Sequence, residues 1–314
     1  MKKPLIILTG PTAVGKTELS IQLAKSVNGA IISADSMQVY KRMDIGSAKI
    51  KPEEMDGISH YLIDIFEPEE EFHVVKFQRY AKKYLEEIYQ QGKIPIITGG
   101  TGFYIQALLY DIDFTKEQED INYRQELEKF ALEYGAHALH QRLAQVDEKA
   151  AEEIHENNVK RVIRALEFHH LSGNKISEHN EQQQQKKSPY EFSYFVLNDE
   201  RSHLYERINN RVDLMIAQGL VEEVRALKES GCKKEMVSMQ GLGYKEILNY
   251  LEGTYSLEDA VYQIKRDTRH FAKRQLTWFR RESEVIWVDK QKFAYDNDKI
   301  IAYMKEKLHH CNII

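Results

Sequence analysis

Eight consecutive residues near the N-terminus constrain this chain more than any other stretch. They follow the apolar run Leu5–Leu8, precede a helix-like segment at Glu18–Ser26, and read Gly10, Pro11, Thr12, Ala13, Val14, Gly15, Lys16 and Thr17. A glycine-rich loop between a strand and a helix turns N–H groups toward an anion, and the helix N-terminus adds a positive dipole end. Lys16 can then reach terminal phosphate oxygens, and the Thr17 hydroxyl can bind Mg²⁺. The motif predicts a phosphate or diphosphate site but does not say whether ATP carries the phosphate.

Apolar runs alternate with helical periodicity over the first hundred residues. Strands are predicted at Ala30–Ala34, Tyr61–Ile65 and Ile94–Thr98, and a helix at Val74–Gln91. This alternation is typical of βαβ units around a parallel sheet, in which ligands bind at the carboxyl ends of the strands. Three polar loops fall at such ends, so we expect them to meet at one edge of the sheet: Thr12–Thr17, Asp35–Tyr40 and Thr98–Tyr104.

The pattern changes between Lys116 and Pro189, where strand signals vanish. Helices are predicted there at Glu117–Tyr134, Ala136–Gln145 and Val159–Leu171. The polar, low-complexity stretch Glu181–Lys187 is predicted to be a mobile loop. We therefore expect a helical insertion at residues 116–189, within an α/β core made of residues 1–115 and 190–314.

A strand at Ser193–Leu197 resumes the core, and the last third of the chain is mostly helical. Its predicted elements are helices at Ser202–Ala217, Val221–Glu229, Tyr244–Tyr250 and Leu257–Arg280, a strand at Glu284–Val288 and a closing helix at Lys292–Leu308. The tail His309-His310-Cys311 is interpreted as solvated, because a structural zinc site needs four ligands at fixed spacing.

Composition limits the class of protein. Hydrophobic residues make up 42% of the chain, which is ample for a core, and the net charge is −5. No apolar run approaches the ~18 residues of a membrane span. The N-terminal stretch lacks a small-residue cleavage site, and the two cysteines, Cys232 and Cys311, are too few for a disulfide framework. We expect a cytoplasmic protein, and nothing in the sequence requires more than a monomer.

Three residues at or near strand ends are candidates for chemistry. Asp35 could bind Mg²⁺, act as a general base or cap the following turn, and Asp64 competes for the metal role. Thr101 lies in the second glycine-rich turn, where its hydroxyl could donate to or accept from a substrate. That turn could equally be a tight connection from strand to helix.

Basic residues form three further candidate sites. Arg207 and Arg211 are four residues apart, so both lie on one helix face and suit polyphosphate oxygens, although a solvated face is a close alternative. Lys160, Arg161 and Arg164 lie opposite an apolar face of Val159, Val162, Ile163 and Leu166. The stretch Lys265–Arg281 holds seven basic residues against one acidic residue in an acidic chain, which indicates contact with a phosphate backbone. Trp278 and Phe279 within it are more typical of core residues than of stacking surfaces.

Taken in order, these motifs resemble the bacterial tRNA dimethylallyltransferase (tRNA isopentenyltransferase) family. The ordered set is far more specific than a P-loop alone and spans nearly the whole chain: Gly10–Thr17, Asp35–Tyr40, Met43–Lys49, Thr98–Tyr104, Lys160–Glu167, Glu206–Val224, Gly241–Glu246 and Thr268–Arg280. The chain departs from the family pattern only at supporting positions, namely His60-Tyr61, Ala48-Lys49-Ile50 and Asn157-Asn158.

The resemblance implies a P-loop NTPase-like parallel-sheet core with a helical insertion that binds the tRNA anticodon loop. It implies transfer of a dimethylallyl group from dimethylallyl diphosphate to N6 of adenosine 37, beside the anticodon, with release of diphosphate. By resemblance, Gly10–Thr17 holds the donor diphosphate, and Lys16, Thr17 and Mg²⁺ stabilise the leaving charge with the help of Arg207 and above all Arg211. Asp35 resembles the group that accepts a hydrogen bond or proton from the N6 amine, and Thr101 resembles a positioning residue.

The tRNA itself is expected to contact dispersed parts of the chain. The candidates are Asp35, Ser36, Met37, Gln38, Thr101, Arg124, Lys160, Arg161, Val162, Ile163, Arg164, Gln240, Gly243 and Lys245, with Lys273 and Arg274 from the basic stretch. A small-molecule P-loop kinase or ATPase is the alternative enzyme, but it gives the basic stretches no role. An RNA-binding module without catalysis leaves the phosphate loop without one.

Overall fold

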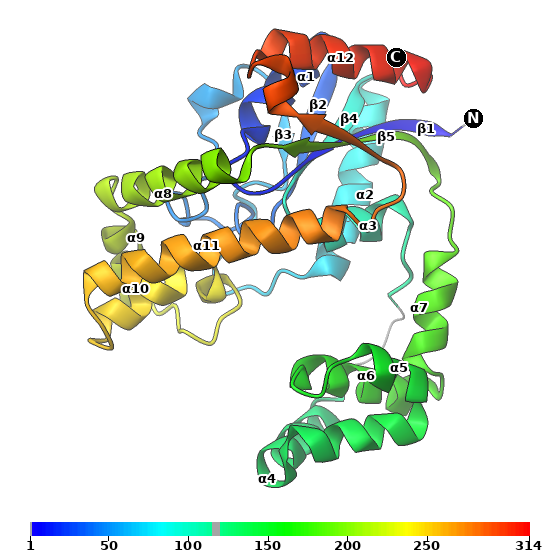
Figure 1. Ribbon diagram of the computed structural model, residues 1–314, viewed down its shortest axis with the longest axis vertical. Helices are drawn as coiled ribbons and strands as arrows, with labels where there is room; N and C mark the ends of the chain where they lie inside the picture. Colours follow the sequence, from blue (N-terminus) through cyan, green and yellow to red (C-terminus); the bar gives the residue numbers. More distant parts are fainter. Residues whose placement is uncertain (1, 115–119) are drawn as a thin grey trace. The chain divides into compact units, whose positions relative to one another are not determined.

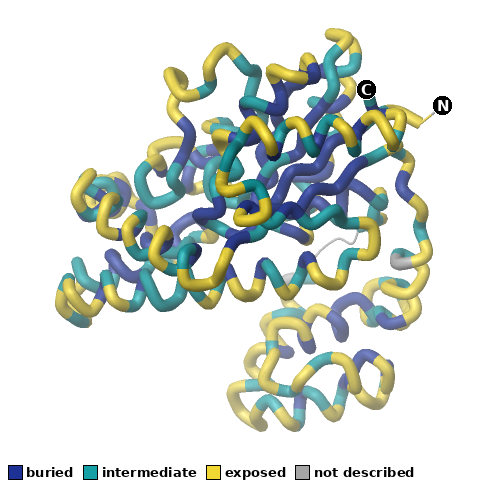
Figure 2. Tube along the Cα trace, turned by 45° about the horizontal axis from the view of Figure 1, so that its top comes forward, coloured by how far each residue is buried: buried dark blue, intermediate teal, exposed yellow. Residues whose placement is uncertain are grey.

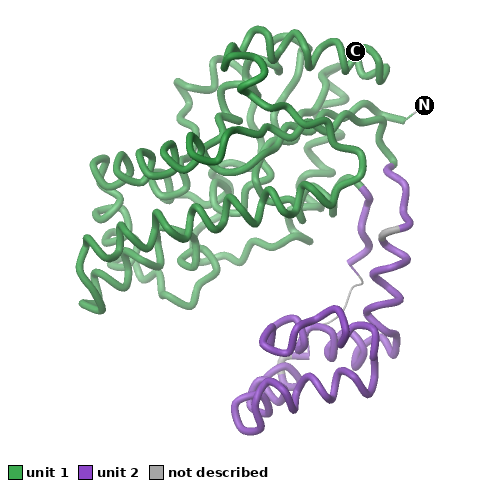
Figure 3. Tube along the Cα trace, viewed as in Figure 1, with its two compact units in different colours: residues 1–109, 189–314 green, residues 110–188 purple. Residues whose placement is uncertain are grey.

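The computed structural model describes residues 2–114 and 120–314, which divide into two compact units. Unit 1 comprises Met1–Leu109 and Pro189–Ile314, and unit 2 comprises Tyr110–Ser188 (Figure 3). The chain therefore leaves unit 1 once and returns to it once. We describe each unit by itself.

A parallel sheet forms the centre of unit 1. Its strands are β1 (Lys3–Thr9), β2 (Gly29–Ala34), β3 (His60–Tyr61), β4 (Ile94–Gly99), β5 (Tyr190–Asn198) and β6 (Val285–Asp289), in the order β3-β2-β4-β1-β5-β6. The predicted α/β class and parallel sheet are confirmed. Strand β3 is shorter than predicted, because Leu62 and Asp64 adopt positive φ angles of 63° and 56° that end regular pairing.

Helices cover both faces of this sheet (Figure 1). Helices α1 (Lys16–Ser26) and α12 (Asn297–His310) pack on one face, and α2 (Val74–Gln90) and α3 (Gly102–Leu109) pack on the other. Because both faces are covered, the strands read as continuous apolar runs, and Figure 2 shows them buried through the middle of the unit. The C-terminal third adds α8 (Arg201–Ala217), α9 (Leu220–Glu229), α10 (Tyr244–Leu251) and the long α11 (Leu257–Phe279), which packs against α8, α10 and α3.

The carboxyl ends of the three central strands are level. Thr9 of β1 pairs with Gly99 of β4, and Gly99 also pairs with Ala34 of β2. The loops that leave these strands therefore start side by side, as predicted. This register sets the position of the candidate site.

The regular elements among the described residues of unit 2 are all helices. It contains α4 (Ile121–Val146), α5 (Glu148–Glu153), α6 (Val159–Ser172) and α7 (Ile176–Gln184), with α4 packed on α6. Gly135, with a φ of 87°, interrupts α4 where two helices were predicted. Val162 and Ile163 lie in its buried core with Leu166, which confirms the predicted apolar face. The first three residues of the predicted helix Glu117–Tyr134, residues 117–119, lie outside the described part of the chain.

Two predicted segments differ from the structure. The loop expected at Glu181–Lys187 is wrong for Glu181–Gln184, which form the end of α7, because a run of glutamine and glutamate has good helix propensity despite its low complexity. Gln185–Lys187 follow the helix and belong to no regular element. The closing helix begins at Asn297, later than predicted. Ala294 and Tyr295 have positive φ angles that no helix accommodates, and Asp296 then caps the helix by accepting from the N–H groups of Asp298 and Lys299 at 3.0 and 3.2 Å.

Within residues 2–114 and 120–314, no helix combines the length and the apolar composition that a membrane crossing needs.

Asp147 is the buried polar hub of unit 2. Its Oδ1 accepts from the Ala150 N–H at 3.0 Å and the Ser177 hydroxyl at 2.7 Å, and its Oδ2 accepts from the Ser177 N–H at 2.9 Å. We expect Asp147→Ala to lower the free energy of unfolding by roughly 3 kcal/mol, because it leaves buried donors unpaired. Chemical denaturation and hydrogen exchange at α5 and α7 measure this loss.

Asp120→Ala is the matched control. Asp120 caps α4 by accepting from the Tyr123 N–H at 3.0 Å, but it is only half-buried. Its replacement should cost about 1 kcal/mol, the usual value for an N-cap. Equal losses for the two variants would contradict the role given to Asp147.

Candidate functional site

The Gly10–Thr17 loop connects β1 to α1, as predicted, and its conformation depends on glycine at Gly10. There φ is 150°, and a Cβ atom would lie 2.6 Å from the carbonyl oxygen of Leu197 on the neighbouring strand β5. No side chain fits in that space. The loop therefore runs close to β5 before α1 begins at Lys16.

Lys16 folds back over this loop. Its Nζ donates to the carbonyl oxygens of Gly10 and Pro11 at 3.0 and 2.8 Å. Burial, followed by the charge of Arg211, lowers the pKa of Lys16 to about 7, and Asp35 opposes the shift. The ammonium group is therefore only partly protonated at neutral pH and gains from an anion beside it.

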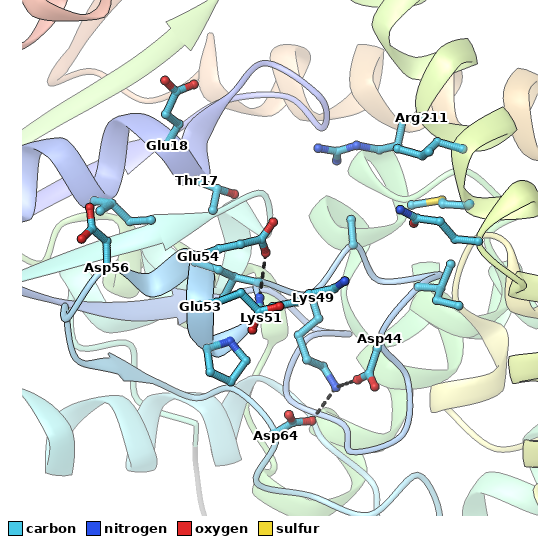
Figure 4. A pocket seen from close by; sticks show the side chains of 18 of the residues that line it. Thr17, Glu18, Asp44, Lys49, Lys51, Glu53, Glu54, Asp56, Asp64 and Arg211 are labelled. Carbon is cyan, nitrogen blue, oxygen red and sulfur yellow. Dashed lines mark hydrogen bonds and ion pairs between the residues drawn. The ribbon is translucent and has the colours of Figure 1, made fainter.

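The two arginines of α8 have different positions. Arg207 donates from Nε to the carbonyl oxygen of Ala13 at 2.8 Å, so it holds the outside of the loop. Arg211 points from α8 toward Thr17 (Figure 4). Burial and the charge of Arg207 lower the pKa of the Arg211 guanidinium, with Asp35 again opposing. Arg211 is therefore the arginine placed for contact with an anion.

A cavity of about 1020 Å³ opens beside Thr17 and Arg211 (Figure 4). Its walls carry apolar atoms of Leu214 and Met215 and many carboxylates, namely Glu18, Asp44, Glu53, Glu54, Asp56 and Asp64. The buried Lys49 donates from Nζ to both Asp44 Oδ1 and Asp64 Oδ1 at 2.5 Å. Asp64, the alternative metal ligand, is thus engaged in an ion pair.

Thr17 is the residue whose chemistry suits Mg²⁺. It is exposed at the N-terminus of α1 and lines the cavity. Among the residues that the structure describes, no three His, Cys, Asp or Glu side chains are grouped as metal ligands. Mg²⁺ keeps several waters and usually binds through one or two protein groups plus phosphate oxygens. A single protein ligand, the Thr17 hydroxyl, therefore suits a Mg²⁺ ion that is also bound by diphosphate oxygens better than one bound by protein side chains alone.

Asp35 and Thr101 adjoin the phosphate loop on the same sheet edge. Asp35 Oδ1 accepts from the N–H groups of Met37 and Gln38 at 2.8 and 3.3 Å, so the carboxylate caps the turn after β2. The Thr101 N–H donates to the Ala34 carbonyl at 3.2 Å, which ties the second glycine-rich loop to the residue before Asp35. A carboxylate and a hydroxyl are thereby fixed next to an anion cradle.

The Asp35–Gln38 turn lies against the segment that contains Gln240, Gly243 and Lys245. Met37 packs on Gly241. Gly243 precedes α10 and donates to Glu246 Oε2 at 2.8 Å, and Lys245 lies 3.4 Å from Glu246 Oε1. Two of the segments predicted to contact tRNA therefore form one surface with the half-buried Ser36.

Glu223 and Lys290 are among the loop-holding side chains that sequence reasoning missed. Glu223 of α9 accepts from the N–H groups of Asp44, Ile45 and Gly46 at 2.9, 2.8 and 3.1 Å. It also accepts from the Tyr244 hydroxyl at 2.8 Å. Lys290, buried after β6, donates to the Val14 carbonyl at 3.4 Å, and burial lowers its pKa. A lone charge on an amphipathic segment gives no signal of such distant partners.

The basic residues of α11 fall into two groups. Lys265 pairs with Asp213, Arg266 with Asp267, and Arg269 donates to Asn209. Farther along, a hollow of about 470 Å³ is lined by His270, Lys273, Arg274, Thr277, Trp278 and Arg281. Phe279 is fully buried, as predicted, whereas Trp278 is half-buried at this surface.

The candidate tRNA-binding residues of unit 2 also fall into two groups, one exposed and one buried. Lys160, Arg161 and Arg164 are exposed on α6, while Val162 and Ile163 lie beneath them in the core. Arg124 of α4 forms a two-pronged pair with the buried Glu167, at 2.7 Å from Nε and 2.9 Å from the terminal nitrogen. An Arg–carboxylate fork of this kind fixes the Arg124 side chain relative to α6.

The lowered pKa of Lys16 leads to a pH-dependent binding prediction. Diphosphate favours the charged ammonium, so binding above pH 7 should take up a proton, whereas below pH 7 Lys16 is already protonated. After correction for the ionisation of diphosphate, affinity should fall by up to about tenfold per pH unit above pH 7. Calorimetry at pH 8 in buffers of different ionisation enthalpy measures the uptake.

Lys16→Arg carries a permanent charge and should show no such proton uptake. Wild-type binding at pH 8 without proton uptake would contradict the assignment of Lys16.

Comparisons with known proteins identify the family of the chain. Residues 38–282 match the family model described as IPP transferase. A tRNA dimethylallyltransferase of Lachnoclostridium phytofermentans is 63% identical over 303 residues, covering 96% of this chain and 97% of that relative. The crystal structure of a tRNA isopentenylpyrophosphate transferase from Bacillus halodurans has a TM-score of 0.74 at 44% identity, covering 99% of this chain and 98% of that one. A eukaryotic dimethylallyltransferase crystallised acting on tRNA has a TM-score of 0.80 at 31% identity, covering 91% of this chain and 74% of that one. The chain belongs to the IPP transferase family.

Proposed function

We propose that this chain transfers a dimethylallyl group from dimethylallyl diphosphate to N6 of adenosine 37, beside the tRNA anticodon, and releases diphosphate. Its family membership makes it a tRNA prenyltransferase. The donor, the acceptor atom and the position in tRNA are the finer part of the proposal.

One observation carries it: an anion cradle and a carboxylate adjoin on a single sheet edge. The loop after β1 presents N–H groups and Lys16, and the loop after β2 presents Asp35, with β4 between them. A kinase would also use the cradle. It would not need the basic surfaces of α6 and α11, and the relatives named above act on tRNA.

The proposed chemistry needs little covalent work from the protein. The bond between the allylic carbon and the diphosphate oxygen breaks, the N6 nitrogen bonds to that carbon, and the N6 proton leaves to Asp35. Lys16, Arg211 and the loop N–H groups stabilise the negative charge that develops on the diphosphate. Thr17 would bind Mg²⁺, which supplies further positive charge when bound.

The acceptor base must leave the anticodon-loop stack to reach this edge, as in other enzymes that modify bases. We propose that each unit contributes a tRNA surface: Lys160, Arg161 and Arg164 on unit 2, and Lys273 and Arg274 on unit 1. Unit 2 would serve as the anticodon-loop-binding domain. Ser36, Met37 and Gln38 would contact the nucleotides near the acceptor.

The direct test incubates the protein with unmodified tRNA and dimethylallyl diphosphate. Mass spectrometry of nuclease fragments of the tRNA should show the added prenyl mass on adenosine 37. ATP turnover without any prenylated adenosine would overturn the proposal in favour of the kinase.

Two substitutions separate the roles of Asp35. Asp35→Asn keeps an oxygen that accepts from the Met37 and Gln38 N–H groups but removes the base, whereas Asp35→Ala also removes the cap. If Asp35 accepts the proton, both variants should lose at least a hundredfold in kcat, and Asp35→Asn should keep its tRNA affinity. Normal turnover with weakened tRNA binding would make Asp35 a binding residue only.

The two groups of basic residues on α11 predict different salt dependences. Replacing Lys273 and Arg274 together by Ala should reduce the slope of log affinity for tRNA against log salt by roughly 1.5. The matched control replaces Lys265 and Arg266, which are paired with Asp213 and Asp267, and should change the slope much less. Equal effects of the two double variants would count against the Lys273–Arg274 surface.

A further inference from the structure

One buried side chain connects both glycine-rich loops of the site. Gln275 of α11 is only 6% exposed. Its Oε1 accepts from the Thr12 N–H at 2.8 Å, and its Nε2 donates to the Gly100 carbonyl at 2.9 Å. These two bonds join the loop after β1 to the loop after β4.

The chemistry of this position requires a neutral amide. The Thr12 N–H can only donate and the Gly100 carbonyl can only accept, so the bridging group must present an acceptor to one loop and a donor to the other. This requirement also fixes which end of the amide is oxygen. A carboxylate or an apolar side chain of the same length satisfies at most one loop.

The second glycine-rich loop is shaped around this amide. A Cβ atom on Gly100 would lie 2.1 Å from Gln275 Nε2, so a side chain at residue 100 would displace the Gln275 amide from this position. This close approach gives a physical reason for the second glycine of the Thr98–Gly102 turn. The Thr12 N–H of the first loop is likewise engaged by Gln275, through its Oε1.

In the proposed reaction, one of the loops that Gln275 joins binds the diphosphate leaving group, and the other carries Thr101, which positions the acceptor. Thr12 lies in the loop that holds the leaving group, and Gly100 directly precedes Thr101. Two exposed basic residues, Lys273 and Arg274, come directly before Gln275 on the same helix. The position of α11 and the separation of the loops are therefore coupled through one side chain.

We propose that Gln275 is a positioning residue that sets the separation between the diphosphate loop and the Thr101 loop. This inference rests on the proposed function and adds to it a control of the reaction distance by α11. Gln275 bonds to the backbones of Thr12 and Gly100, so it would act through the two loops. Its effect is on the alignment of donor and acceptor, to which reaction rates are steeply sensitive.

The test uses two variants of the full chain. Gln275→Leu removes both hydrogen bonds with little change of volume, and Gln275→Glu keeps the acceptor for Thr12 but loses the donor to Gly100. We expect kcat to fall by about tenfold to a hundredfold in Gln275→Leu, while KM for dimethylallyl diphosphate changes less than threefold. Gln263→Leu, at a half-buried glutamine of the same helix, is the matched control.

Hydrogen exchange at the Thr12 amide gives a readout besides turnover. Exchange should accelerate in Gln275→Leu and stay slow in Gln275→Glu, because only the second variant keeps the acceptor. A merely structural role would instead lower the melting temperature and leave kcat unchanged below it, and that result would overturn the inference.

The inference and the proposed function fail in different ways. If the wild-type protein forms no prenylated adenosine, the proposed function fails. If the wild type is active and Gln275→Leu retains its kcat, or loses no more than Gln263→Leu, the positioning role fails.

Discussion

Four cationic side chains from separate parts of unit 1 lie around the Gly10–Thr17 loop. Lys16 bonds to the carbonyls of Gly10 and Pro11, Arg207 to that of Ala13, and Lys290 to that of Val14. Arg211 lies close enough to lower the pKa of Lys16. Like charges at this spacing disfavour one another's charged forms. The loop is thus a site prepared for an anion, whose binding relieves the repulsion.

The sheet explains how a carboxylate can be placed beside so much positive charge. Parallel strands end on the same edge, and the register of β2, β4 and β1 makes those ends level. Asp35 is therefore close enough to oppose the lowering of the pKa values of Lys16 and Arg211. The cap that fixes its carboxylate uses only backbone N–H groups of its own turn. In the proposed reaction, the proton acceptor and the cradle for the leaving group would thus come from the ends of β2 and β1, which flank β4.

The C-terminal third of the chain contributes the side chains that hold the N-terminal loops in place. Glu223 collects three N–H groups of the Asp44–Gly46 turn, and Arg207 and Lys290 hold the phosphate loop. Gln275 joins that loop to Gly100. Helix α11 therefore has two distinct faces. The buried Gln275 on one face bonds to both loops of the site, and the other face exposes Lys273 and Arg274 to solvent.

The sequence alone determined the phosphate loop, the parallel α/β class, the three convergent loops and the family, because each depends on local patterns. Glycine spacing, strand runs and helical periodicity are set by residues close together in the chain. It also placed Val162 and Ile163 on an apolar face. It mistook the glutamine-rich part of α7 for a loop, since low complexity masked good helix propensity.

Only the tertiary structure decided which charges are already paired and which side chains hold the loops. Lys265 and Lys273 look alike in sequence, yet Asp213 engages the first and a surface hollow is lined by the second. Gln275 reaches Thr12 across 263 positions of the chain and Gly100 across 175. The physical reason is that periodicity reports the face of a helix, whereas the partner of that face is set by how strands and helices are ordered in space.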